Sequence, residues 1–426
     1  MRIAVWHNLP AGGAKRALHD HIGCLVERGH EVQVWSPPSA TREFLPFDAR
    51  VEEHLVNLEV EDPPRWKTGR RLDSLKSPRP IIQAVEAHCK QCAREINRGA
   101  FDVNLIGTCQ LFASPPIGRH LYGPSALYLQ EPNRHLWEAG WDFPWLAAPV
   151  EGRSRGVRAV KTLLEAIRIH RRSQRARYEV DNATSYDLVL VNSFFSREAV
   201  LRTYDVEAEV CYLGVDTQRF RPMNTVREDT VVGVGMLAKH KNAKLVVEAV
   251  ALMPEPRPRV LWITAAIDET YATVVRNLAD AGGVDFEVRH NADDESLVSL
   301  LNRACVLVYA SRLEPFGLVP LEASACELPV VAIHEGGLRE IVEHEMNGLV
   351  VRPTASELAG AIRRIRTDPE LATRLGRTGR ALVSARWTTD QAAARLEGWL
   401  SSLVMSDDGP STGTYSSDPA NRRPLP

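Results

Sequence analysis

The sequence lacks the long apolar segments that carry a chain into or across a membrane. It contains no run of about 18 apolar residues and no apolar stretch of signal-peptide length near its N-terminus. We therefore expect a cytoplasmic protein. A strong net charge is also missing, because 52 basic residues are balanced by 54 acidic ones. This balance argues against a polyanion-binding protein, so we expect no nucleic-acid partner.

Cysteine is scarce as well. The seven cysteines form an odd number, and without a secretory signal we expect them to be free thiols. Cys89 and Cys92 form a single C-x-x-C pattern inside a helical segment. Without a second such pair, zinc binding is weakly indicated, and two partly buried thiols are the simpler interpretation.

Alternating strand and helix patterns are what the sequence does contain. Residues 2–6 (RIAVW) read as a strand, 10–29 as a glycine loop and a helix, and 30–36 as a second strand, which together predict a βαβ unit. The same alternation returns after residue 222. We therefore predict an α/β protein with two facing, doubly wound parallel-sheet domains and a cleft between them.

The domain boundaries follow from these patterns. We predict an N-terminal domain over 1–215, a second domain over 222–385, and a helix over 386–405 that packs back toward the N-terminal domain. The tail 406–426 is rich in Ser, Gly, Pro and Asp, so we expect it to be disordered.

Two glutamates, Glu314 and Glu322, flank a Pro-Phe-Gly turn that follows an apolar strand. Ligands of open parallel sheets bind at the carboxyl ends of strands, so both carboxylates should face the cleft. The amides of Phe316, Gly317 and Leu318 lie at a helix start, which suits a phosphate, whereas carboxylates accept hydrogen bonds from hydroxyls. A sugar nucleotide satisfies both. The alternative is that both glutamates are solvated acids that favour the helix dipole.

The stretch 314–323 (EPFGLVPLEA) resembles the E-x7-E signature of retaining glycosyltransferases of family 4, which have the GT-B fold of two Rossmann-like domains. The similarity extends over most of residues 1–400. Further segments that resemble the family are 8–35, 187–200, 211–222, 232–250 and 328–351.

The resemblance implies a role for each matching residue. Glu314 would contact the transferred sugar, Glu322 would hold the ribose of the donor, and the amides after Glu314 would contact the sugar and phosphate region. The glycine loop at Gly12 and Gly13 would let the backbone approach the diphosphate or the acceptor, because a larger side chain would block it.

Two positions depart from the family pattern. At the start of the second domain the family often has G-R-L-x-x-x-K, whereas this chain keeps Gly235 and Lys241 but has Met236 in place of the arginine. Lys241 would then bind the diphosphate without its partner. Relatives commonly have His where Gln130 stands, and glutamine cannot take up a proton near pH 7.

The expected reaction is transfer of a sugar from a UDP- or GDP-sugar to a hydroxyl acceptor with retention, in which Glu314, Gln130 and Lys241 form the catalytic group. No D-x-D motif occurs, so we expect neither a metal nor a cofactor beyond the donor. The acceptor would be a glycan, a glycolipid or a small molecule. The alternatives are a catalytically silent binding protein of the same fold and another sugar-nucleotide enzyme such as an epimerase.

The segment 153–177 is strongly basic. It contains nine basic residues and only one acidic residue. The apolar residues Val157, Val160, Leu164 and Ile167 recur at helical spacing. One interpretation is a helix docked through its apolar face with a solvated basic back. The other is peripheral contact with an anionic membrane or a lipid-linked acceptor. Trp137, Trp141 and Trp145 precede the segment and would line a sugar platform, form a lipid-facing edge or simply pack.

Overall fold

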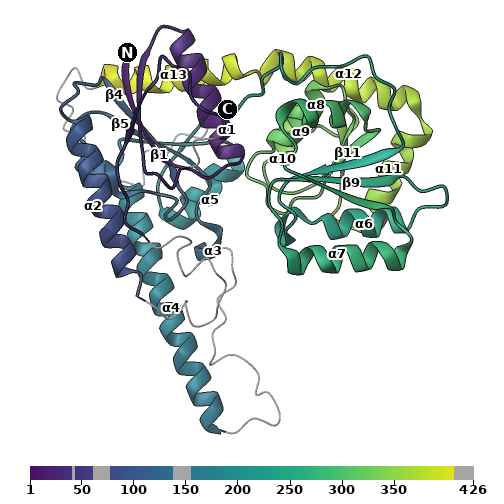
Figure 1. The fold of residues 1–426 in the computed structure, drawn as a ribbon, viewed down its shortest axis with the longest axis horizontal. Helices are drawn as coiled ribbons and strands as arrows, with labels where there is room; N and C mark the ends of the chain where they lie inside the picture. Colours follow the sequence, from purple (N-terminus) through teal and green to yellow (C-terminus); the bar gives the residue numbers. More distant parts are fainter. Residues whose placement is uncertain (41–43, 61–76, 138–154, 407–426) are drawn as a thin grey trace, which may run out of the picture.

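The structure is a computed structural model that describes residues 1–40, 44–60, 77–137 and 155–406, and Figure 1 shows two α/β units side by side. The first contains a parallel sheet of seven strands in the order β3-β2-β1-β4-β5-β6-β7. Its strands are β1 (Arg2–Asn8), β2 (Glu31–Ser36), β3 (Glu52–Leu55), β4 (Val103–Cys109), β5 (Ser125–Gln130), β6 (Leu188–Val191) and β7 (Glu209–Val210).

Helices connect these strands. They are α1 (Gly13–Glu27), α2 (Arg79–Ile96), the 3₁₀ helix η3 (Pro116–His120), α3 (Arg134–Trp137), α4 (Arg155–Ala183) and α5 (Phe194–Tyr204). The helix α4 is much longer than the others, and Figure 1 shows it extending well beyond the sheet of its own domain. The basic segment predicted from the sequence forms most of this helix from residue 155 onward, whereas Arg153 lies outside the described residues.

The second unit holds a parallel sheet of six strands in the order β10-β9-β8-β11-β12-β13. The strands are β8 (Thr230–Val234), β9 (Arg259–Thr264), β10 (Phe286–His290), β11 (Val306–Tyr309), β12 (Val330–Ile333) and β13 (Gly348–Val351). The helical elements are η4 (Lys239–Lys241), α6 (Ala243–Ala251), α7 (Glu269–Gly282), α8 (Asp294–Arg303), α9 (Leu318–Ala325), α10 (Leu338–Ile341), α11 (Ala355–Thr367), α12 (Pro369–Arg386) and α13 (Thr389–Ser406).

The central strands of both sheets are buried on both faces. Val5 and Leu105 pair across β1 and β4, and Val232 and Leu307 pair across β8 and β11, all without solvent exposure. Parallel sheets covered by helices need such continuous apolar strands, which explains why the sequence reads there as short unbroken runs of Val, Ile and Leu. The predicted fold class, two Rossmann-like parallel-sheet domains, is confirmed.

The strand order fixes where a ligand binds. In each sheet the strand order changes direction once. From the first strand the chain adds strands on one side and then crosses to the other side, so the change lies between β1 and β4 in one unit and between β8 and β11 in the other. Such switch points leave a crevice at the carboxyl ends of the strands. The glycine loop at Gly12 and Gly13 follows β1, Gly235 follows β8, and Glu314 follows β11. All of these residues therefore lie at switch points.

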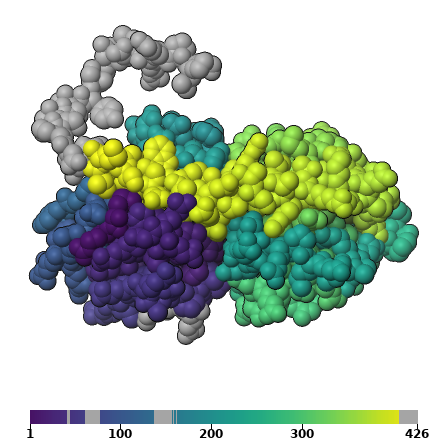
Figure 2. Space-filling view, turned by 90° about the horizontal axis from the view of Figure 1, so that it is seen from above, coloured from purple at the N-terminus to yellow at the C-terminus, as the bar shows by residue number. Residues whose placement is uncertain are grey.

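The C-terminal helices run across both units, as Figure 2 shows for the yellow segment. The helix α13 is fastened to the end of α1 by ion pairs that Arg28 makes with Glu397 and Asp390, each at 2.8 Å. His30 also contacts Glu397 at 3.0 Å. None of the described helices is both long enough and apolar enough to span a bilayer. The residues 407–426 of the predicted tail lie outside the described residues.

Candidate functional site

The loop between β11 and α9 carries the first glutamate of the signature. Its path depends on Gly317, which caps α9 with a left-handed backbone (φ 113°). A side chain there would begin 2.8 Å from Leu338 and 2.9 Å from Ile341, so only glycine fits. Among the described residues no side chain caps this helix, and its first N–H groups are left for a ligand. Phe316 points into the core and contributes only its backbone.

Glu314 is largely buried and paired with Lys241. The ammonium of Lys241 donates to Glu314 Oε2 at 2.7 Å and to the hydroxyl of Tyr309 at 3.3 Å, and Ser311 also donates to Glu314. Burial raises the pKa of Glu314, but the Lys241 charge and the two hydrogen bonds outweigh it and hold that pKa below its ordinary value. The structure thus joins two of the three predicted catalytic residues in one ion pair.

Gly235 and Met236 lie beside this pair. Gly235 has φ 136° and its α-carbon faces the Lys241 stem, so an added Cβ would lie 3.4 Å from that side chain. That distance is an ordinary van der Waals contact, so the positive φ, and not a lack of space, is what favours glycine at the end of β8. Met236, which replaces the family's arginine, is 42% exposed and does not belong to the core. The site consequently has room for a longer, charged side chain at this position.

Glu322 is the second glutamate of the signature and lies within α9, with 5% of its surface exposed. Its nearest cationic neighbour is Arg16 of α1, with Nε 3.8 Å from Glu322 Oε1. No described residue donates a hydrogen bond to this carboxylate. Burial raises the pKa of Glu322 to about 7, because the nearby Arg16 charge compensates only in part. A carboxylate in this state is poised to accept hydrogen bonds from a ligand.

Arg16 also connects the two units, a feature that the sequence analysis missed. Its guanidinium forks onto the carboxylate of Asp294 at the start of α8, with Nη1 2.9 Å from Oδ2, and Arg219 donates to the same oxygen at 2.9 Å. Arg16 lies 278 positions from Asp294 in the chain. No local pattern could have predicted the pair, because Arg16 follows β1 and Asp294 follows β10 of the other sheet.

The glycine loop approaches α9 directly. An added Cβ on Gly13 would lie 3.6 Å from Leu318 Cδ1, and Gly12 has a left-handed backbone with φ 152°. Of the sequence-predicted residues, Gly12, Gly13 and Leu318 therefore meet across the two units. This contact lies one helical turn from Glu322 on one side and from Arg16 on the other, so all of these residues lie where the two units meet.

Gln130 lies at the opposite wall, at the end of β5. Its backbone is left-handed (φ 60°), and the pairing of β5 with β6 shifts register at this residue. Such a bulge re-aims a side chain and recurs near functional sites. Asn192 holds the Gln130 side chain by donating to its Oε1 at 3.0 Å.

Arg134 links this wall to the signature loop. It pairs with Glu131 at 2.5 Å and donates to the carbonyls of Arg312 (3.1 Å) and Leu313. Burial raises the pKa of Glu131, and Arg134 only partly reverses this effect. The sequence pattern pointed to Gln130 alone and indicated no role for Glu131 or Arg134.

Other sequence signals have structural explanations. Cys89 and Cys92 are fully buried free thiols on α2, and all seven cysteines are free. Within residues 1–40, 44–60, 77–137 and 155–406, no group of three or more His, Cys, Asp or Glu side chains is arranged to hold a metal.

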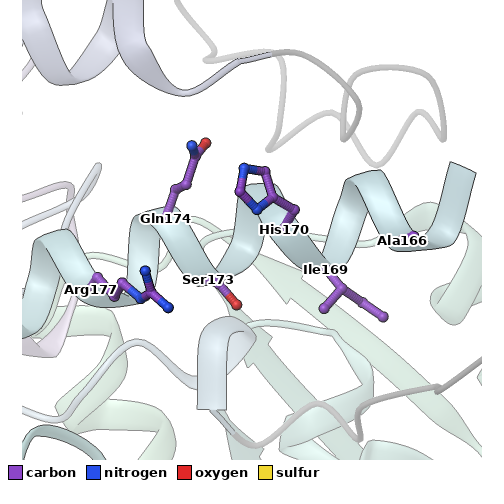
Figure 3. A pocket seen from close by; sticks show the side chains of 6 residues that line it. All are labelled: Ala166, Ile169, His170, Ser173, Gln174 and Arg177. Carbon is purple, nitrogen blue, oxygen red and sulfur yellow. The ribbon is translucent and has the colours of Figure 1, made fainter. Parts of the chain in front are cut away.

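A shallow pocket of about 280 Å³ lies on α4, away from the cleft, and holds none of the predicted site residues. In Figure 3, His170 and Gln174 project from one side of the helix and Ile169 and Ser173 from the other. The residues that line it are Ala166, Ile169, His170, Ser173, Gln174 and Arg177. Trp141 and Trp145, considered above as a sugar or lipid contact, lie outside the described residues.

The chain is similar to known sugar-transferring proteins. It is 32% identical over 239 residues to the GDP-mannose-dependent alpha-(1-6)-phosphatidylinositol monomannoside mannosyltransferase of Mycobacterium tuberculosis, covering 50% of this chain and 61% of that protein. It is 24% identical over 247 residues to human alpha-1,3/1,6-mannosyltransferase ALG2, covering 51% of this chain and 59% of that protein. The matched part thus spans about three-fifths of these relatives.

Solved structures agree with the fold. Sucrose-phosphate synthase from Thermosynechococcus elongatus superimposes with a TM-score of 0.71 at 19% identity, over 95% of this chain and all of that one. HepE of Anabaena in complex with UDP gives a TM-score of 0.68 at 19% identity, over 94% of this chain and all of that one. At such identities the likeness shows the GT-B fold alone.

The family profile described as "Glycosyl transferases group 1" matches residues 215–382. This region holds Gly235, Lys241, Glu314 and Glu322, four of the residues singled out in the sequence. The resemblance noted in the sequence is thereby confirmed at the level of this domain and of the fold: the chain carries a glycosyl transferases group 1 domain in a GT-B architecture.

Proposed function

We propose that the protein is a metal-independent, retaining glycosyltransferase that moves a sugar from a nucleoside diphosphate to a hydroxyl acceptor. The observation that carries this proposal is the pair of signature glutamates, one bound to Lys241 and the other without a described hydrogen-bond donor, on either side of an uncapped helix N-terminus. Phosphate suits the helix end and Lys241, and hydroxyls suit the two carboxylates.

The nucleoside would be held by Glu322. A ribose diol has two O–H donors, which can satisfy a buried carboxylate that Arg16 approaches only to 3.8 Å. The diphosphate would then extend along the start of α9 toward Lys241, with the amides of Gly317 and Leu318 as donors. The loop at Gly12 and Gly13 would cover it, because glycine allows the backbone to come close.

The chemical step would break the bond between the sugar C1 and the phosphate oxygen while a bond from C1 to the acceptor oxygen forms on the same face. The proton of the acceptor hydroxyl would pass to the leaving phosphate oxygen. Lys241 would stabilise the negative charge that grows on the diphosphate, which is usually the largest contribution to such catalysis. Glu314 would orient the sugar, and Gln130 would position the reacting centre from the opposite wall.

Donor binding and turnover test this proposal. Calorimetry with UDP, GDP, UDP-glucose and GDP-mannose should identify one base. GDP-mannose comes first because the two relatives reported above are mannosyltransferases by name. Release of UDP or GDP from the matching sugar nucleotide should follow. Binding without release would favour the silent binding protein, and turnover without free nucleotide would favour an epimerase. No binding at millimolar concentration would refute the enzyme altogether.

The acceptor side includes α4, and we propose that this helix contacts an anionic membrane surface. Val160 and Leu163 are 59% and 62% exposed, and they continue an exposed stripe to Ala166 and His170. An apolar stripe flanked by Lys and Arg is typical of helices that lie in a lipid interface. The free cysteines fit action at the cytoplasmic face, where thiols stay reduced.

The sequence left two interpretations of the basic residues on α4, the solvated back of a docked helix and a contact with an anionic surface. In the structure the side chains of Arg168, Arg171, Arg172 and Arg175 are only partly exposed. Arg175 donates to the carbonyl of Leu111 and lies over the Phe112 ring, so it supports the fold. Val160 and Leu163 are among the exposed residues of α4, and Figure 1 shows this helix projecting beyond the sheet of its domain.

Vesicle co-sedimentation tests the membrane contact. Wild-type protein should sediment with vesicles of phosphatidylglycerol and phosphatidylcholine but not with phosphatidylcholine alone, and about 1 M salt should weaken the binding. Val160→Ser with Leu163→Ser should reduce sedimentation about tenfold or more. Leu252→Ser is the matched control, since Leu252 has the same exposure as Leu163 but lies in the other unit. Equal loss in the control, or none in the double variant, would refute the contact.

A further inference from the structure

The N-terminus of α5 is held by an acidic side chain of the other unit, Glu340 of α10. The two carboxylate oxygens of Glu340 accept hydrogen bonds from the backbone N–H groups of Phe194 and Phe195, each at 2.9 Å. The Tyr212 hydroxyl donates to the same carboxylate at 2.9 Å. Helix N-termini have unsatisfied N–H groups and the positive end of the helix dipole. Glu340 thus completes a cap that α5 cannot make alone.

The same helix end contacts the signature loop. Ser193 caps α5 by accepting from the N–H of Ser196 at 2.9 Å, and its hydroxyl donates to the carbonyl of Pro315 at 2.5 Å. Pro315 directly follows Glu314. On the opposite side of the loop, the N–H of Gly337, which begins α10, donates to the carbonyl of Glu314 at 2.8 Å. The loop that carries Glu314 is therefore held between α10 and the cap of α5.

The cap also reaches the N-terminal wall of the cleft. Asn192 donates to Gln130 as described, and Ser196 donates to Asn192 Oδ1 at 2.8 Å. Residues 192–196 therefore contact Gln130 in one unit and Pro315 in the other. Glu340 is the charged group that fastens this short segment to the second unit.

We propose that Glu340 is a positioning residue that sets the distance between Gln130 and Glu314 by binding the N-terminus of α5. Its carboxylate keeps the two walls of the cleft together, and α5 transmits that arrangement to both residues. The consequence for sugar transfer rests on the proposed function, whereas the contact between the units does not. The nucleotide contacts proposed for Glu322 and Lys241 lie within the second unit and should survive its loss.

The variant Glu340→Gln separates these effects. The amide keeps one acceptor, but its NH₂ group faces a second backbone N–H, and the charge at the helix end is lost. We expect release of UDP or GDP from UDP-glucose or GDP-mannose to fall about tenfold in kcat, while the affinity for free UDP or GDP stays within about twofold. The radius of gyration from solution scattering should increase as the units separate.

Glu343→Gln is the matched control. Glu343 follows α10 in the chain and its exposed carboxylate contacts only Arg386, at 3.7 Å, among the described residues. This variant should match wild type in scattering, turnover and nucleotide affinity. Unchanged turnover in Glu340→Gln would overturn the proposal. So would a Glu340→Gln protein that unfolds or loses nucleotide affinity and turnover together, because Glu340 would then serve the fold of the second unit.

The scattering measurement needs no substrate, which keeps the two hypotheses apart. A wild-type protein that binds and turns over no sugar nucleotide would refute the proposed function. An unchanged radius of gyration in Glu340→Gln would refute the contact between the units, whatever the reaction is.

Discussion

The replacement Glu322→Gln should change both the stability of the protein and the pH dependence of nucleotide binding. Burial raises the pKa of Glu322 from 4.5 to about 7, and Arg16 offsets this only in part. Between these two pH values the folded protein keeps a proton that the unfolded chain has lost. Stability therefore falls as pH rises from 4.5 to 7, and it is fully reduced above pH 7.

The magnitude follows from that interval. The difference between a pKa of 4.5 in the unfolded chain and of about 7 in the folded protein corresponds to about 3 kcal/mol of unfolding free energy at pH 8. Glutamine carries no charge to bury, so Glu322→Gln should be more stable than wild type at pH 8 by up to about 3 kcal/mol and equal to it near pH 4.5. A binding site often keeps a buried charge that its ligand needs, although that charge destabilises the folded protein. Removing it is then expected to raise the stability.

Nucleotide binding should respond in the opposite sense. A ribose diol donates hydrogen bonds, so it binds the ionised carboxylate and favours loss of the proton. With a pKa of about 7 in the free protein, the affinity of wild type for UDP or GDP should rise about tenfold between pH 6 and pH 8. The nucleotide's own phosphate titrates in this range, so the informative quantity is the difference between wild type and Glu322→Gln.

Urea unfolding and calorimetry at pH 6, 7 and 8 provide both measurements. The variant should bind more weakly at pH 8 by about tenfold or more, the value of a lost charge-assisted hydrogen bond. Equal pH slopes for the two proteins, or a variant less stable than wild type at pH 8, would show that Glu322 is ionised and satisfied by Arg16 in the free protein. The assignment of Glu322 to the ribose would then fail.

Three further predictions concern the other end of the donor site. Glu314→Ala should lower kcat with a sugar nucleotide. The affinity for free UDP or GDP should stay unchanged or rise slightly, because Lys241 loses its internal partner; an equal loss of turnover and of nucleotide affinity would contradict the role of Glu314. Met236→Arg should tighten nucleotide binding about tenfold in calorimetry, since the exposed position can direct a second cation to the diphosphate, and an unchanged affinity would mean that another residue already serves there. Gly235→Ala should cost about 1–3 kcal/mol in urea unfolding, because φ 136° is unfavourable for alanine. Gly360→Ala, within α11 and with nothing within 4 Å of an added Cβ, should cost none.

The sequence by itself determined the fold class and the local setting of the signature. Strand and helix periodicities are properties of neighbouring residues, so β1, α1 and β2 could be predicted from about 35 residues of chain. The parallel direction of the strands then predicted that ligands bind at their carboxyl ends. Glu314 could be expected in a loop and Glu322 in the helix that follows, because only eight positions separate them and both settings depend on local sequence.

Only the tertiary structure decided which side chains act together. The partner of Glu314 is Lys241, 73 positions away, and the partner of Phe194 is Glu340, 146 positions away. The first contact depends on how β8 and β11 pair within one sheet, and the second on how the two units meet, and no local periodicity encodes either. The helix α4 gives the same lesson. Composition marked it as basic, but only the structure shows that Arg168, Arg171, Arg172 and Arg175 are partly covered while Val160 and Leu163 are exposed.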